Sequence, residues 1–287
     1  MKGQVLRVIS GFYDVLDQDN KEHRLRGSGK LRNANQSPVV GDWVLFDQQG
    51  LVLEVLERKN SFVRPKIANV DQVLVVMSIK EPNFSPLLLD KYLMIIESKR
   101  IKPIICITKV DLEPNYRDIV ADYVKMGYEI FFLNHKDHTS DDLEKLKEVF
   151  KNKLSVFLGQ SGVGKTTTIN KLSNSDFETQ EISKSLNRGK HTTRVTQIVE
   201  WNGGQLIDTP GFSSLEIEID KYDLSRAFNI FDKYASGCKF RSCFHYQEKN
   251  EDCNIKEMVK RNIISIVRYE NYISILKEKL GEKNAKN

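Results

Sequence analysis

Residues 154–166 read Leu154-Ser155-Val156-Phe157-Leu158-Gly159-Gln160-Ser161-Gly162-Val163-Gly164-Lys165-Thr166, and a polar helix-like run, Thr167 to Leu172, follows. An apolar strand, a glycine-rich loop and a helix in this order are typical of a phosphate-binding loop. The glycines let backbone N–H groups surround a phosphate at the helix N-terminus, while Lys165 reaches the β and γ phosphates and Thr166 binds Mg²⁺. A structural glycine turn explains neither the lysine nor the threonine. The predicted nucleotide-binding residues here are Gly159, Gln160, Ser161, Gly162, Val163, Gly164, Lys165, Thr166 and Thr167.

Around this loop, apolar strands alternate with amphipathic helices, which predicts βαβ crossovers and a largely parallel sheet. The first strand is Val73 to Met77, and Ser85 followed by Pro86 predicts a helix start. Further strands are expected at Ile104 to Ile107 and Ile130 to Leu133, with one helix near Asn115 to Met126 between them. The α/β layer runs to about residue 217.

A second motif, Asp208-Thr209-Pro210-Gly211, ends a strand about 40 residues after the loop. A carboxylate at Asp208 can hold the Mg²⁺ shell, and the Gly211 N–H can sense a γ-phosphate. Alone this motif is weak, but its place after a phosphate loop favours a functional role.

The base is indicated by Thr108-Lys109-Val110-Asp111, because the Asp111 carboxylate can accept both N–H groups of a guanine edge. Alone, the tetrapeptide would more often be a surface Lys-Asp pair, but the other two motifs favour guanine. Thr108 stands where many GTPases have asparagine, so an amide hydrogen bond is lost. In ordinary GTPases this motif follows the phosphate loop, whereas here it precedes it, which indicates a circular permutation.

Three of the four cysteines cluster in Cys238-x4-Cys243-x-His245-x7-Cys253. Three thiolates and an imidazole suit tetrahedral Zn²⁺, and four protein ligands leave no position for a catalytic water. The alternative is a set of buried free cysteines with a surface histidine. Cys106, inside an apolar run, is predicted to be a core residue.

The flanks of the α/β layer are basic: residues 1–66 carry 11 basic and 8 acidic side chains, and residues 218–287 carry 14 and 11. Short β-like runs in residues 1–66 predict a small barrel. We therefore predict domains at 1–66, 67–217 and 218–287, the last mainly helical. No apolar run is long enough to span a bilayer, and a cytoplasmic monomer is expected.

The order of motifs and flanking modules resembles the RsgA (YjeQ) family of circularly permuted, ribosome small-subunit-dependent GTPases. The resemblance covers nearly the whole chain and implies an N-terminal OB-fold, a permuted P-loop GTPase and a C-terminal zinc domain. It further implies late maturation of the 30S subunit, with hydrolysis of GTP to GDP and phosphate before release. It also implies one structural Zn²⁺ per chain.

The resemblance assigns further residues by their matching positions. His191 would act in subunit-stimulated hydrolysis, with Lys165, and Thr192 or Thr193 would reach Mg²⁺. Phe212 stands where Ras-like proteins carry a catalytic glutamine, so another group must orient water. The barrel would contact 16S rRNA through a basic loop, although such a loop is often only solvated: Arg24, Arg26, Lys30 and Arg32.

The chain departs from the family at Asn134-His135-Lys136, where a Ser-Ala-Lys-like contact to guanine is usual. Two rival functions remain open from the residues. One is a nucleotide-gated RNA-binding module in which hydrolysis is incidental, and the other is a metabolic P-loop kinase or ATPase. Guanine preference and stimulation by 30S subunits separate the three.

Overall fold

The computed structural model describes residues 1–33, 36–136, 141–173, 195–209 and 219–281. By their contacts these residues form two compact units. The first contains Met1–Leu74, Thr139–Ser161 and Lys165–Ser213, and the second contains Val75–His138, Gly162–Gly164 and Ser214–Asn287. The predicted domain bounds at 66 and 217 stay a prediction.

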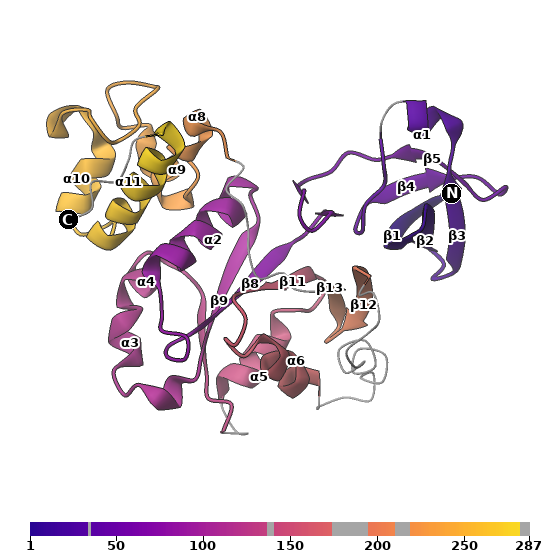
Figure 1. The fold of residues 1–287 in the computed structure, drawn as a ribbon, viewed down its shortest axis with the longest axis horizontal. Coiled ribbons are helices and arrows are strands. Elements are labelled where there is room, and N and C mark those ends of the chain that lie inside the picture. Colours follow the sequence, from indigo (N-terminus) through magenta and orange to yellow (C-terminus); the bar gives the residue numbers. More distant parts are fainter. Residues whose placement is uncertain (34–35, 137–140, 174–194, 210–218, 282–287) are drawn as a thin grey trace. The chain divides into compact units, whose positions relative to one another are not determined.

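The N-terminal part of the first unit is a closed five-stranded barrel (Figure 1). Strands β1, β2 and β3 are antiparallel neighbours, β4 pairs with both β1 and β5, and a short parallel pairing of β3 with β5 closes the ring. Alternate side chains fill its core, among them Val5, Val15, Leu25 and Phe46. The elements are β1 (Lys2–Ile9), β2 (Phe12–Asp17), β3 (Glu22–Gly27), α1 (Gly29–Asn33), β4 (Trp43–Phe46) and β5 (Leu51–Val55).

The rest of the first unit carries the strand before the phosphate loop. That strand, β11 (Leu154–Leu158), lies parallel to β13 (Gly204–Asp208), which forms a hairpin with β12 (Gln197–Trp201). The hairpin turn uses Asn202 at φ 49° and Gly203 at φ 70°, the left-handed conformations that a tight Asn-Gly turn requires. The flanking elements are β6 (Ser61–Phe62), β7 (Ile67–Ala68), α5 (Asp141–Glu148) and α6 (Lys165–Ser173).

The α/β part of the second unit has strand order β10-β9-β8, with β9 and β10 parallel. Its helix α2 (Pro86–Ser98) begins as predicted, since the Ser85 side chain accepts a hydrogen bond from the Leu88 N–H at 3.3 Å. The strands are β8 (Gln72–Ser78), β9 (Lys102–Thr108) and β10 (Ile130–Leu133).

The single helix predicted from Asn115 to Met126 is wrong. It is two short helices, α3 (Tyr116–Ile119) and α4 (Ala121–Lys125). The backbone leaves the helical region at Val120 (φ −110°, ψ 7°), whose side chain is fully buried. Val120 and Tyr123 are both buried.

The C-terminal part of the second unit is helical, as predicted, with long α11 packed on α2 (Figure 1). Arg268 of α11 is 1 % exposed, and its guanidinium lies 3.0 Å (Nε) and 2.9 Å (Nη2) from the buried Asp90 of α2. The helices of this part are α8 (Lys221–Leu224), α9 (Asn229–Ala235), η2 (Asn250–Asp252), α10 (Asn254–Lys260) and α11 (Ile266–Leu280), while a short helix of the α/β part, η1 (Val110–Leu112), follows β9. Within the described ranges, no helix has the length and apolar character needed to cross a bilayer.

Candidate nucleotide site and metal centre

The phosphate loop is held by its own lysine. Lys165 is the first residue of α6, and its ammonium donates hydrogen bonds to the carbonyl oxygens of Gly159 and Gln160, the latter at 2.6 Å. Burial lowers the pKa of Lys165, because desolvation disfavours its charged form. The side chains of Thr166 and Thr167 are exposed at the start of the helix. The loop thus has the strand-loop-helix setting that the sequence predicted.

Asp208 is the last residue of β13 and lies at the same sheet edge as the loop. The parallel register pairs Val156 of β11 with Ile207, so the two strands end side by side before Gly159 and after Asp208. Gly211, and also His191, Thr192 and Thr193, lie outside the described residues.

In the second unit, Thr108 connects the predicted base motif to the phosphate loop. It ends β9 fully buried, and its hydroxyl donates to the Val163 carbonyl at 2.5 Å; the Met77 carbonyl is 3.3 Å away. Thr108 precedes Val163 by 55 residues, whereas in ordinary GTPases the base motif follows the phosphate loop. The sequence predicted that threonine in place of asparagine loses a hydrogen bond across the site. The Thr108 hydroxyl nevertheless makes a hydrogen bond to the loop.

Two glycines of the loop have conformations that suit only glycine. Gly162 and Gly164 have φ +80° and +94°. A Cβ at Gly164 would lie 2.8 Å from Cε1 of His135 and 3.6 Å from Oγ1 of Thr108. His135, which the sequence identified only as a departure, is thus a neighbour of the loop.

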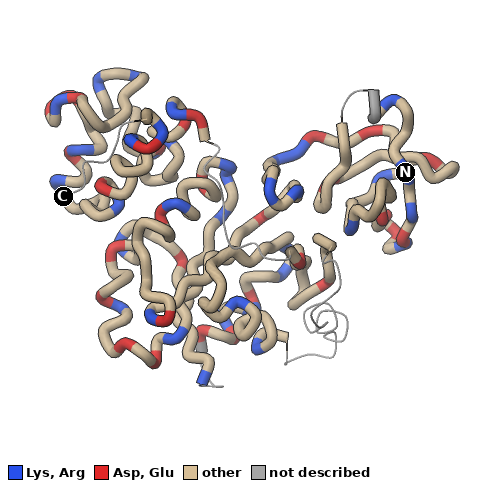
Figure 2. Tube along the Cα trace, viewed as in Figure 1, with Lys and Arg blue, Asp and Glu red and all other residues tan. Residues whose placement is uncertain are grey.

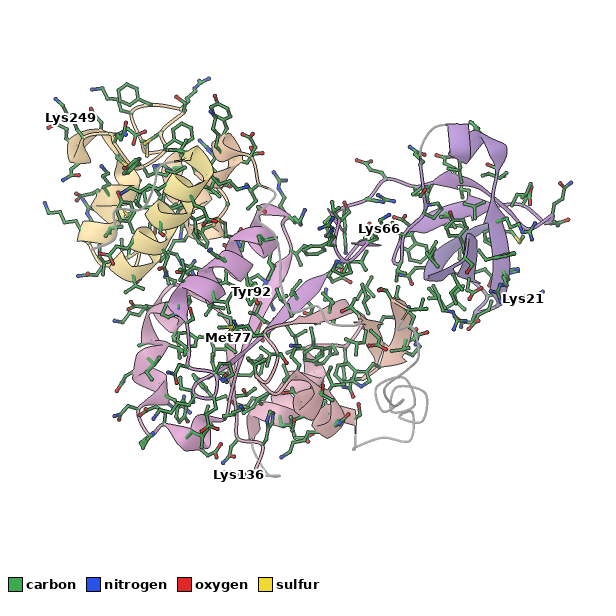
Figure 3. All side chains as sticks on the ribbon, in the orientation of Figure 1. Lys21, Lys66, Met77, Tyr92, Lys136 and Lys249 are labelled. Carbon is green, nitrogen blue, oxygen red and sulfur yellow. The ribbon has the colours of Figure 1, made fainter. Side chains whose placement is uncertain are left out.

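The predicted guanine-reading carboxylate is paired with a lysine. The Lys136 ammonium lies 2.7 Å from Oδ2 of Asp111, and its hydrogen bond is the main reason that the pKa of Asp111 is lowered. Lys136 follows β10 and is labelled in Figure 3. The neighbouring Lys109 donates to the Glu81 carbonyl. No local pattern in the sequence indicates the contact between Lys136 and Asp111.

The cysteine and histidine cluster is brought together as predicted. The ligand atoms of Cys238, Cys243, His245 and Cys253 all lie within 4.8 Å of one another. Nδ1 of His245 is 3.6 Å from the Cys238 sulfur and 3.5 Å from that of Cys253. A soft, four-ligand set of this kind fits a tetrahedral metal ion.

Burial sets the protonation of the ligand atoms in a way that favours binding of a cation. Burial lowers the pKa of His245 to about 4, so its imidazole is neutral, and Nε2 lies 3.2 Å from the Ser225 carbonyl, which leaves Nδ1 as the ligand atom. Burial raises the pKa of the Cys243 and Cys253 thiols, so their ionisation needs a nearby positive charge. Glu248, which the sequence did not single out, accepts backbone N–H groups on either side of His245.

On the barrel, Arg24 and Arg26 lie over one aromatic ring. Their guanidinium carbons are 5.1 and 4.5 Å from the Phe12 ring centroid, and both side chains are exposed. Asp14 is 3.7 Å from Arg24. Acidic and basic positions are interspersed along the barrel (Figure 2). Lys30 is exposed, and the side chain of Arg32 lies outside the described residues.

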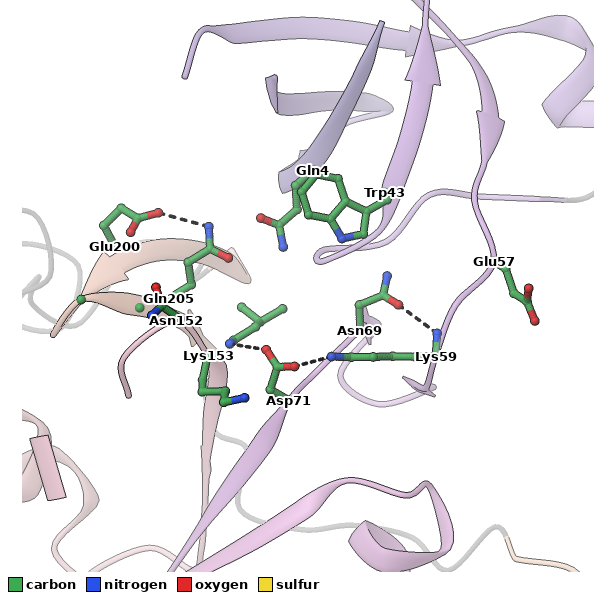
Figure 4. A pocket seen from close by; sticks show the side chains of 13 residues that line it. Gln4, Trp43, Glu57, Lys59, Asn69, Asp71, Asn152, Lys153, Glu200 and Gln205 are labelled. Atoms are coloured by element: carbon green, nitrogen blue, oxygen red, sulfur yellow. Dashed lines mark hydrogen bonds and ion pairs between the residues drawn. The ribbon is translucent and has the colours of Figure 1, made fainter. Parts of the chain in front are cut away.

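A cavity of about 620 Å³ opens in the first unit, and none of the predicted site residues lines it (Figure 4). Asp71 lies in the wall of this cavity, where its carboxylate pairs with Lys59 and accepts a hydrogen bond from the Leu154 N–H at 2.7 Å. These contacts fix the start of β11, which gives this wall a structural role. Thirteen residues line the cavity: Gln4, Trp43, Glu57, Lys59, Asn69, Asp71, Asn152, Lys153, Leu154, Glu200, Gly203, Gly204 and Gln205.

Comparison with known families matches residues 55–218 to the RsgA GTPase family and residues 2–51 to the RsgA N-terminal domain. A relative from Mesomycoplasma hyopneumoniae, named small ribosomal subunit biogenesis GTPase RsgA, is 51% identical over 279 residues, which cover 96% of this chain and 97% of the relative. A relative of the same name from Bacillus subtilis is 39% identical and covers 96% of this chain and 97% of its own length.

Two solved structures are similar over nearly the whole chain. YloQ, described as a circularly permuted GTPase, has a TM-score of 0.79 at 34% identity and covers 99% of this chain and 96% of its own. YjeQ from Thermotoga maritima has a TM-score of 0.80 at 32% identity and covers 98% and 99%. The predicted architecture of strand barrel, permuted GTPase and cysteine-rich helical region is thereby confirmed. The chain belongs to the RsgA family of circularly permuted GTPases.

Proposed function

We propose that the protein hydrolyses GTP to GDP and phosphate and assists late maturation of the small (30S) ribosomal subunit, which stimulates hydrolysis and so triggers release. The hydrogen bond from Thr108 to Val163 is the observation that carries the nucleotide part, because it puts the base motif against the phosphate loop despite the permuted order. The names of the relatives support the ribosomal part.

In this proposal each motif has one task. Asp111 accepts the two N–H groups of guanine, and Thr108 and Lys109 position that motif. The backbone of residues 159–167 surrounds the phosphates, and Lys165 exchanges its carbonyl partners for phosphate oxygens. Thr166 and Asp208 hold Mg²⁺, and Gly211 senses the γ-phosphate.

Hydrolysis requires that a water be oriented, and Phe212 cannot do so. We assign this task to His191, with Lys165 stabilising the developing negative charge and Thr193 or Thr192 reaching Mg²⁺. Intrinsic turnover is then slow, and the subunit raises it by acting through His191. A His191→Ala protein with full stimulation by 30S subunits would contradict this assignment.

The cluster of Cys238, Cys243, His245 and Cys253 binds one Zn²⁺ with a structural role, since its four ligands complete a tetrahedron. The metal would stabilise the loops between α9 and α11. The proposed modules are a barrel at 1–66, a GTPase at 67–217 and a zinc domain at 218–287.

Contact with the subunit includes 16S rRNA, which the barrel meets through Arg24, Arg26, Lys30 and Arg32. Exposed guanidinium groups beside Phe12 suit a phosphate backbone with an adjacent base. The protein would act as a cytoplasmic monomer. If affinity for the subunit does not fall with ionic strength, phosphate contacts are not its main source.

The decisive experiment compares GTP and ATP turnover by the purified protein alone, with 30S subunits and with 50S subunits. The expected result is turnover specific for GTP and strongly stimulated by 30S alone. Equal use of ATP would favour a general P-loop hydrolase. Guanine-specific binding with no stimulated turnover would favour a nucleotide-gated RNA-binding module.

A further inference from the structure

The pairing of Lys136 with Asp111 affects how guanine reaches its site. A guanine edge presents two N–H donors and therefore uses both oxygens of one carboxylate. In the free protein the Lys136 ammonium lies 2.7 Å from one of these oxygens, Oδ2. The carboxylate that reads the base thus already has a charged donor before any nucleotide arrives.

We propose that Lys136 is an internal competitor for guanine at Asp111: its ammonium holds Oδ2 in the free protein, and the base displaces it. The inference rests on the proposed role of Asp111 in reading guanine.

The two partners differ in exposure in a way that suits displacement. The Lys136 side chain is 77 % exposed, whereas that of Asp111 is 18 % exposed. A long exposed side chain leaves one geometry at little cost, while the carboxylate stays in place. The backbone N–H of Lys136 donates to the Asn134 side chain at 2.9 Å, so the chain turns here independently of the ammonium. Removal of the ammonium should therefore leave the turn intact.

The lysine also neutralises the charge of this carboxylate. Exposed ion pairs of this kind contribute modestly, so the competition should weaken guanine binding by about 2- to 5-fold. It should also be sensitive to salt, since ions screen an exposed pair. A neutral ligand that must break an ion pair will bind more tightly as ionic strength rises.

The test uses guanosine, which has no phosphate whose charge could mask the effect, in competition with a fluorescent GDP analogue. Lys136→Met is expected to bind guanosine about 2- to 5-fold more tightly than the unaltered protein at low salt. The affinity of the unaltered protein should rise with salt toward that of the variant, and the affinity of the variant should stay flat. Lys136→Arg, which keeps a cation, should behave like the unaltered protein.

Lys80 provides a matched control, because its ammonium lies 2.8 Å from Glu113, two residues after Asp111, and is 46 % exposed. Lys80→Met removes the same charge nearby and should not change guanosine affinity. Unchanged or weaker guanosine binding by Lys136→Met overturns the inference. Failure of the proposed function looks different: Asp111→Ala would then leave guanosine binding unaltered.

Discussion

Arg268→Met should destabilise the second unit by removing the cation that, among the described residues, pairs with the buried Asp90 carboxylate. The Asp90 side chain is fully buried, 2.9 Å from Nη2 of Arg268. It keeps hydrogen bonds from Asn271 (2.6 Å) and Tyr123 (3.1 Å) but no positive charge. Breaking a buried ion pair by removing one partner costs about 3–5 kcal/mol.

The loss extends beyond the ion pair. The Arg268 guanidinium carbon is 4.3 Å from the Phe228 ring centroid, and Nη1 donates to the Tyr128 hydroxyl at 2.5 Å. Tyr128 in turn donates to Glu97 at 2.5 Å. Methionine fills much of the same volume, so the cost is mainly electrostatic. At roughly 2–4 °C per kcal/mol the unfolding midpoint should fall by about 10 °C.

The assay is hydrogen exchange of the amides in α2 and α11, together with calorimetry. Tryptophan fluorescence is unsuitable because Trp43 and Trp201 both belong to the first unit. Arg261→Met is a matched control, since Arg261 pairs with Glu257 on the surface and should change stability by less than about 0.5 kcal/mol.

A double variant tests the electrostatic origin. Asp90→Asn combined with Arg268→Met removes both charges and should be more stable than the sum of the single changes predicts, by about 1–3 kcal/mol. If Arg268→Met alone costs less than 1 kcal/mol, or if the two changes simply add, the network is not held together by charge and the reasoning fails.

Three further outcomes are expected. Thr108→Val leaves the Val163 carbonyl without its donor and should weaken GDP binding about 3- to 10-fold in a titration, whereas Thr108→Asn should restore most of the affinity. Cys243→Ser should lower the zinc content of the purified protein below one per chain, measured by elemental analysis, and full occupancy would refute the assigned ligand set. Burial raises the pKa of Glu97, so the folded protein binds the carboxyl proton more tightly than the unfolded chain does. The free energy of unfolding should therefore fall as pH rises above about 4.5, the pKa of an exposed glutamate. Calorimetry between pH 4.5 and 7 should show a flatter dependence for Glu97→Gln.

The strands and motifs could be read from local patterns, because each depends on neighbours in the chain. Leu154 to Leu158 and Ile130 to Leu133 are apolar runs between turn signals, and both are strands with the predicted bounds. Strands β2 and β3 were not predicted, since barrel strands such as Glu22–Gly27 keep charged side chains on the solvent side. Their closure depends on pairings that no local pattern encodes.

The side-chain partners could not be predicted for the same reason. Lys136 was noted as a departure from a family motif, but its contact with Asp111 needs the ends of β9 and β10 to lie side by side. Arg268 occupies the same helical face as Tyr272 and Ile275, a position where an arginine indicates a buried partner. The sequence alone does not identify that partner, which lies 178 residues earlier.

That separation also sets an order of events during synthesis. Asp90 and Glu97 are made early, within the half that carries the base motif, yet the cation that compensates them is added only when translation reaches residue 268. Until then the acidic groups of α2 lack their cation, so burying this face of the helix carries a desolvation penalty, which Glu97 lessens by taking up a proton. The half of a nascent chain that carries the predicted base motif should therefore finish folding late, in one step with its C-terminal helix.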